Sequence, residues 1–224
     1  FRIGYELIPG NPPKTSIAND AASCGHIPLV RMLRARGKLC SSRGADRAAG
    51  QGFMEMVDDL RLQNIECTCN GANMAAAAGN LVVVAQLRQQ GIHCTREGAN
   101  GAASSGYLDV VHDLRAHGIH CTSAGADGAA ARGHLNILQD LSSHDIYCSP
   151  RAPNLAAEAG FLEVIQYLEE QDISPTNRCI DVVVQRGHLH VIRHLLALKF
   201  RFLNFHADSA AMYGYLDIIR EFRQ

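Results

Sequence analysis

Cysteine and histidine are the residues with which this 224-residue chain could bind a metal ion. Cys67 and Cys69 lie close together, and the pair His93-Cys94 recurs 27 positions later. Zinc needs four such ligands gathered at one point. Because each pair lies a full sequence repeat from the next, we expect no metal site and no cofactor.

Five of the eight cysteines occupy one position of a 27-residue period. The next two residues at that position are Pro175 and Phe202, which indicates a packing position. Neighbouring units pack about 10 Å apart, whereas a disulfide needs Cα atoms within about 7 Å. We therefore expect these thiols to be buried and reduced. Reduced thiols indicate an intracellular, reducing compartment, of which the cytoplasm is favoured and a host cell or a virion is also compatible. The five are Cys40, Cys67, Cys94, Cys121 and Cys148.

A second set of polar residues could form a ladder of carboxylates for catalysis or metal binding. Half of its members are Asn, which favours a structural role over a chemical one. Each side chain either is the N-cap itself or bonds a neighbouring loop amide, and the sequence leaves both open. The set comprises Asn19, Asp46, Asn73, Asn100, Asp127, Asn154, Asp181 and Asp208.

No group of residues has the pattern of a catalytic site. A reactive cysteine needs a base beside its thiolate, and nothing in the sequence fixes one. The glycine-rich stretch GADGAAARG at 125–133 lacks a phosphate-binding pattern, and variants of it recur from unit to unit. We expect no enzymatic activity, no catalytic residue and no small-molecule ligand.

An array of repeats underlies all of these patterns. Eight units begin at residues 17, 44, 71, 98, 125, 152, 179 and 206 without any insertion. The ninth residue of each is Gly, which predicts a left-handed backbone at the end of a short first helix. The fifth and sixth residues are paired alanines in seven units, as at Ala129 and Ala130, so this helix can lie close to its neighbours.

A second helix follows the glycine in each unit. The spacing of Leu108, Val110, Val111 and Leu114 places these side chains on one face of an amphipathic helix. A Ser or Thr, such as Thr122, precedes the next first helix and is an N-cap candidate. Helices of about ten residues are marginal alone, so the units must stack. The sequence thus predicts an all-α solenoid of about eight helix-turn-helix repeats.

The repeats are expected to form one domain, residues 17–224, preceded by an extended segment or cap at 1–16 that contains three Pro and two Gly. The seventh repeat departs from the pattern, because it lacks the alanine pair, the cap and the cysteine and adds Phe200, Phe202 and Phe205. These rings either pack against a larger neighbour, which we favour, or form an exposed patch that docks a partner.

The stretch AAARGHLNILQDLSSHDI resembles the helical core of ankyrin repeats, and Gly133, His134 and Leu135 match the Gly-His-Leu of that family's motif. The 27-residue period is shorter than the family's, which is about 33, and the Thr-Pro-Leu-His segment is absent. The chain is more similar to the shortened ankyrin-like repeats of amoebae, oomycetes and giant viruses of amoebae. The resemblance implies hairpins that are shortened or absent, and a scaffold that binds a protein partner along its concave face.

Charge and hydropathy argue against other partners. The formal net charge is −1, whereas a strong phosphate binder carries a basic excess, so we expect no nucleic acid. No apolar run approaches the roughly 20 residues that span a bilayer, so we expect no membrane contact. The expected function is a non-enzymatic scaffold for a protein partner. The alternative is a structural subunit or adaptor embedded in a larger assembly, such as a virion or a multi-protein complex.

Partner contacts are expected where the repeats vary, on the first helices and the loop tips. Arginine and aromatic side chains are common interface anchors. The candidates are Arg132, Arg151, Glu158, Arg178, Gln185, Arg186, Phe205 and Tyr213.

A stripe of arginines marks the second helices. Arg34, Arg61, Arg88 and Arg115 share one position, and Asp recurs two positions earlier in the period, as at Asp140. This alternation predicts ion pairs between repeats. A phosphate-binding ridge is the other interpretation, but the interleaved carboxylates argue against it.

Overall fold

The computed structural model describes residues 16–222 and contains, within that range, sixteen α-helices, one short 3-10 helix and no strand. The prediction of an all-α solenoid of helix-turn-helix repeats is confirmed, and the described residues form no β-hairpin. The predicted N-terminal segment lies outside the described residues except for Ser16, which begins the first helix.

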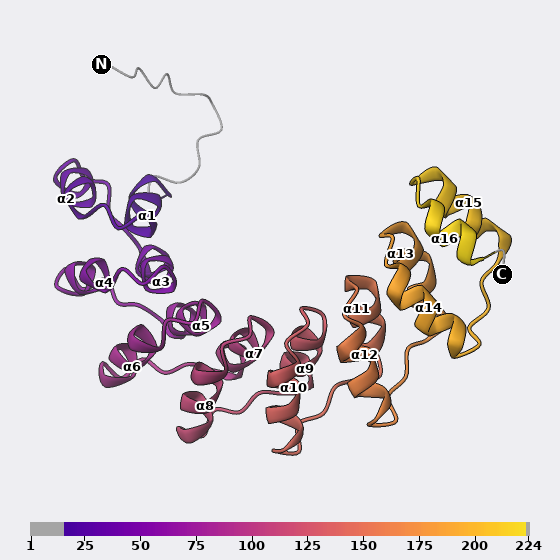
Figure 1. Ribbon diagram of the computed structural model, residues 1–224. Coiled ribbons are helices and arrows are strands. Elements are labelled where there is room, and N and C mark those ends of the chain that lie inside the picture. The colour runs from indigo at the N-terminus through magenta and orange to yellow at the C-terminus, as the bar shows by residue number, and fades with distance from the viewer. Residues whose placement is uncertain (1–15, 223–224) are drawn as a thin grey trace. The chain divides into compact units, whose positions relative to one another are not determined.

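Each repeat consists of a first and a second helix (Figure 1). The first helices are α1 (Ser16–Ser23), α3 (Ser42–Gly50), α5 (Cys69–Ala77), α7 (Arg96–Ser104), α9 (Ser123–Ala130), α11 (Ala152–Ala159), α13 (Ile180–Gln185) and α15 (Asn204–Met212). The second helices are α2 (Ile27–Ala35), α4 (Met54–Arg61), α6 (Leu81–Gln89), α8 (Leu108–Ala116), α10 (Leu135–Ser142), α12 (Leu162–Glu169), α14 (Leu189–Ala197) and α16 (Leu216–Glu221). The 3-10 helix η1 (Asn177–Cys179) leads into α13.

The repeats are grouped in two larger compact parts, Phe1–Gly98 and Ala99–Gln224, which are called the first unit and the second unit from here on. In the first unit, α1 packs on α3 and α3 packs on α5. In the second unit, α9 packs on α11, α11 on α13 and α13 on α15, and these neighbours can be followed in Figure 1. The single repeat domain predicted for residues 17–224 stays a prediction.

The core follows the repeat. Ala129 and Ala130 have no exposed surface, and the same is true of the alanine pairs in most other units. Three of the four residues predicted on the apolar face of α8 are buried, since Val110, Val111 and Leu114 are at most 2% exposed, and Leu108 is partly exposed. Small residues in the first helices and branched residues in the second therefore supply most of the apolar burial that stabilises each stack.

The ninth-position glycine meets two demands at once. Gly133 has a φ of +77°, as the left-handed helix end predicted. The ring of Phe161 from the following repeat also lies over it, and a Cβ on Gly133 would come within 2.5 Å of that ring. His134 covers Gly106 in the same way. Burial beside this turn lowers the pKa of His134, and Arg132 lowers it further.

A second left-handed position, twelve residues after each glycine, ends the second helices. Sequence reasoning missed it, although the residues share the 27-residue period and most are Gly, Asn or Asp, the types that adopt this conformation most readily. They are Gly37, Asn64, Gly91, Gly118, Asp145, Asp172 and Lys199, all with φ between 59° and 80°.

The cysteine position is a packing position, as predicted. Cys67 and Cys121 are 6% and 7% exposed, and the Sγ of Cys121 donates to the carbonyl of Ala99 at 3.2 Å. Burial raises the pKa of the Cys121 thiol to about 11. For Cys67, burial and the hydrogen bond to the Asp46 carboxylate raise the pKa to about 12. These thiols are therefore protonated at neutral pH and unreactive.

Within residues 16–222, the helices are too short and too polar for any of them to cross a membrane.

Candidate functional site

A ladder of hydrogen bonds fixes the start of the first helices relative to one another. The Asn100 side chain accepts a bond from the Thr122 amide at 2.8 Å, 22 positions later. Asp127 accepts the Ser149 amide at 2.7 Å in the same way. Of the two roles that the sequence left open for the Asn and Asp residues, the bond to a neighbouring loop amide is observed for six of the eight, whereas Asp181 contacts the ring of His206.

The hydroxyl of each junction completes this arrangement. Thr122 Oγ1 accepts a bond from the Ala124 amide, so it caps α9, while the Asn100 amide group donates to the same oxygen at 3.0 Å. The predicted N-caps are confirmed for Thr68, Thr95 and Thr122. Ser149 accepts a bond from the Arg151 amide, but α11 begins only at Ala152, and the side chains of Ser41 and Thr176 make no capping bond. Because the loops at Thr68, Thr95 and Thr122 are each held through both the amide and the hydroxyl, the residue two positions after the hydroxyl is presented at a defined place at the start of the next helix.

An open groove lies along these helix starts in the first unit. It has a volume of about 690 Å³ and runs from α3 past α5 to the start of α7. Its walls carry guanidinium, hydroxyl, amide and thioether groups, together with one exposed carboxylate, that of Glu97. The lining residues are Ser42, Arg43, Asp46, Arg47, Thr68, Asn70, Asn73, Met74 and Glu97.

The four charged side chains of this groove sum to zero, but their surroundings differ. Both oxygens of Asp46 accept bonds from Thr68, at 2.6 and 2.8 Å, so its charge is engaged within the junction. Arg47 donates to Asp20 at 2.6 Å. Arg43 is exposed at the groove, where its guanidinium can bind an anion, and Glu97 is the opposing charge at the far end.

The predicted contact residues all lie in the second unit, on first helices, on the loops before them or just after their ends. Arg151, Arg178 and Phe205 occupy the register position that Arg43 and Asn70 hold in the groove, and all are exposed. That they contact a ligand stays a prediction.

The other candidates lie near the ends of the first helices. Arg132 is exposed and donates to the Ser104 carbonyl at 3.2 Å, and Gln185 is exposed. Arg186 donates to the half-buried Glu158 at its carbonyl, at 2.8 Å. Burial lowers the pKa of the neighbouring His188.

The seventh repeat supports both interpretations of its phenylalanines in part. Phe202 packs, with its ring centroid 5.0 Å from that of Phe222. Phe205 is 51% exposed and lies against His206, and Tyr213 is 49% exposed and stacks on Tyr215. The packing that we favoured therefore holds for Phe202 and not for Phe205.

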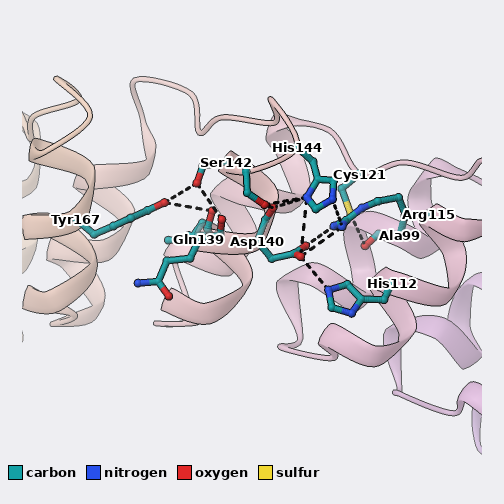
Figure 2. A network of polar contacts seen from close by, with 11 residues as sticks. Ala99, His112, Arg115, Cys121, Gln139, Asp140, Ser142, His144 and Tyr167 are labelled. Atoms are coloured by element: carbon teal, nitrogen blue, oxygen red, sulfur yellow. Dashed lines mark hydrogen bonds and ion pairs between the residues drawn. The ribbon is translucent and has the colours of Figure 1, made fainter.

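In the arginine stripe of the second helices, Arg115 forms the predicted ion pair with the next repeat, and for Arg34, Arg61 and Arg88 such pairs stay a prediction. Figure 2 shows Arg115 of α8 donating to Asp140 of α10, whose carboxylate also contacts His112 at 2.8 Å. Arg115 lies 2.9 Å from His144 as well. Partial burial acts to raise the pKa of Asp140, but the bonds from Arg115 and His112 outweigh it and hold this pKa below its usual value.

In the part of the chain that the structure describes, no three His, Cys, Asp or Glu side chains gather as a metal site would require.

Comparisons with known proteins found matches among solved structures alone. No protein-family model matches the chain, and no curated protein sequence does either. Among solved structures, the pentatricopeptide repeat protein PPR10 from maize is similar, with a TM-score of 0.44 and 14% identity over 95% of this chain and 39% of that one. The same protein in complex with an 18-nt psaJ RNA element has a TM-score of 0.49 and 15% identity over 95% and 38%. A cysteine variant in complex with that RNA has a TM-score of 0.49 and 14% identity over 95% of this chain and 38% of that one.

The chain thus spans about two fifths of the length of the structures it matches. Two of these structures are RNA complexes, and they contradict the prediction of a protein-binding scaffold without a nucleic-acid ligand. The alternative prediction, a structural subunit or adaptor in a larger assembly, is contradicted with it. The prediction of no nucleic-acid ligand relied on the net charge of −1, which is a sum over the whole chain. Acidic side chains such as Asp140 and Asp46 are engaged between repeats, whereas Arg43 and Arg178 are exposed. The sum therefore says little about the charge of the first-helix side.

Proposed function

We propose that this chain is a non-enzymatic repeat scaffold that binds single-stranded RNA along its first helices. The observation that carries the proposal is the groove between Arg43 and Glu97. Guanidinium groups bind phosphates with charge-assisted hydrogen bonds. Unpaired bases present free edges, which hydroxyl and amide groups such as those of Ser42 and Asn70 can bond.

The repeat supports a ligand that is itself a repeating chain. The loop ladder holds the helix starts at regular intervals, and the exposed residue there changes from one repeat to the next, from Arg43 to Asn70 to Glu97. A single strand offers a phosphate and a base at each step, so a row of differing side chains can contact successive nucleotides. PPR10 is described in complex with RNA; its likeness to this chain extends to the fold alone, and the proposal rests on this groove.

The experiment is a titration of a fluorescent single-stranded RNA of mixed sequence, followed by anisotropy at several salt concentrations. Arg43→Gln should weaken binding about tenfold, which is about 1.4 kcal/mol, and should flatten the slope of log K against log salt by about 0.7. Glu97→Gln should strengthen binding, because it removes the opposing charge. Arg36→Gln changes another exposed arginine, at the end of α2, and is the matched control that should leave binding unchanged.

Two results would count against RNA binding. One is wild-type protein that fails to bind RNA at low salt. The other is equal loss of binding in Arg43→Gln and Arg36→Gln, since that would indicate non-specific attraction rather than a groove.

We further propose that the units are shortened ankyrin-like repeats. The support is the Gly-His-Leu sequence at Gly133–Leu135, together with the left-handed glycine that separates a short first helix from a second. A sequence profile built from the eight units should recover ankyrin repeats before other helical repeats; recovery of pentatricopeptide repeats first would overturn this assignment.

A further inference from the structure

We infer, on the basis of the proposed function, that the two ends of helix α15 form a stacking site for unpaired nucleobases, with Phe205 and Tyr213 as its two platforms. Both rings are about half exposed, at 51% and 49%. They lie near opposite ends of α15, which places them about 12 Å apart along the helix for eight residues. Each ring can therefore take its own base.

One of these rings occupies the same position of the 27-residue period as an arginine of the groove. Phe205 stands eight positions before Tyr213, and it occupies the place that Arg43 holds at the groove. One repeat earlier, the same two places are held by Arg178 and Arg186, both exposed. Because α13 packs on α15, the pair of arginines at the ends of one first helix is followed directly by a pair of aromatic rings at the ends of the next. This pairing matches the chemistry of a nucleotide, which has an anionic phosphate and a flat base.

Each exposed ring is backed by a second ring that limits its motion. The centroid of Phe205 lies 4.1 Å from that of His206, and Tyr213 stacks on Tyr215 at 6.3 Å with an interplanar angle of 23°. His206 is itself only 4% exposed. A ring held on one face and open on the other loses little freedom when a base stacks on it, so more of the stacking energy appears as affinity.

The test uses single-stranded RNA that carries 2-aminopurine, whose fluorescence is quenched when it stacks. The chain contains no Trp, so the protein contributes little emission of its own. Wild-type protein should quench the probe. Phe205→Leu and Tyr213→Leu should each lose part of the quenching and weaken binding about tenfold, with an unchanged salt slope because no phosphate contact is removed.

Controls separate stacking from folding. Phe205→Tyr keeps a ring and should keep both quenching and affinity. Tyr147→Leu removes a ring that is 52% exposed but lies outside the first helices, and it should change neither. An abasic RNA should bind wild type and Phe205→Leu equally.

The outcomes distinguish this inference from the proposed function. If Arg43→Gln weakens RNA binding while Phe205→Leu and Tyr213→Leu do not, the stacking site is wrong and RNA binding stands. If quenching is lost in Phe205→Tyr as well, the ring is not acting as a platform, and the inference is also wrong. If wild type binds no RNA, both fall together.

Discussion

His206 Nε2 lies 2.9 Å from Asp181 Oδ1, and this contact replaces the hydroxyl junction of the earlier repeats. Elsewhere a Ser or Thr amide donates to the Asn or Asp that stands 22 positions earlier in the same repeat, but the seventh repeat has Leu203 in place of the Ser or Thr. The Leu203 amide donates to His206 Nδ1 at 2.7 Å instead. One buried imidazole therefore connects the last two repeats, and it also backs Phe205.

Removing this imidazole should destabilise the last junction. His206→Gly leaves the Leu203 amide without its acceptor and should lower the free energy of unfolding by about 2 kcal/mol. Adding Leu203→Thr to His206→Gly rebuilds the junction found at Thr68 and should recover most of the loss. Urea unfolding followed by circular dichroism measures both variants. Equal stability of the single and double variants would show that the imidazole does not replace the hydroxyl.

Lys199 is the least suitable residue at the second left-handed position. Its φ is +64°, and a side chain in this region costs about 1 kcal/mol or more. Lys199→Gly should therefore raise the thermal midpoint, although glycine loses more entropy on folding. Gly118→Ala is the converse variant, because open space surrounds the added Cβ and only backbone strain is introduced. Opposite signs for the two variants would support the conformational explanation, whereas a lower midpoint for Lys199→Gly would reject it.

The fold was predictable because every structural requirement recurs with the period. Eight glycines in register predicted the left-handed turns, and the apolar spacing of residues such as Val111 and Leu114 predicted the buried face. The second left-handed position was missed because Gly, Asn, Asp and Lys share it, and mixed identities hide a common backbone demand. The hydrogen-bond partner of Asn100 could not be predicted from the sequence, because it lies 22 positions away.

The candidate site was less predictable, because it depends on which charges remain exposed. The charges of Asp46 and Arg43, three positions apart, cancel in the net charge of the chain. In the structure, however, Asp46 is bonded by Thr68, whereas Arg43 is exposed at the groove. The predicted residues were chosen in the second unit, and the groove lies in the first. Register connects them, since Arg178 and Phe205 repeat the position of Arg43.

Gly133 should be more sensitive to substitution than Gly118. Both have a φ of +77°, so alanine introduces similar backbone strain at each. At Gly133 the new Cβ would also lie 2.5 Å from the Phe161 ring, which must move. Overpacking of this kind adds about 1–3 kcal/mol, so Gly133→Ala should lose that much more stability than Gly118→Ala in urea unfolding. Equal losses would mean that the ring moves aside without cost.

Alkaline pH should destabilise the stack through its buried thiols. Burial and the bond to Asp46 raise the pKa of Cys67 from 9.0 to about 12. The unfolded thiol loses its proton near pH 9 while the folded thiol keeps it. The contribution of this thiol to the free energy of unfolding is therefore fully present below pH 9 and is lost as the pH rises towards 12. The loss is about 1.4 kcal/mol per pH unit in this range. Urea unfolding at neutral pH and near pH 10 should show a smaller decrease for Cys67→Ala than for wild type. Cys69→Ala, at an exposed cysteine two residues away, is the matched control, and an equal decrease in all three proteins would rule out Cys67 as the cause.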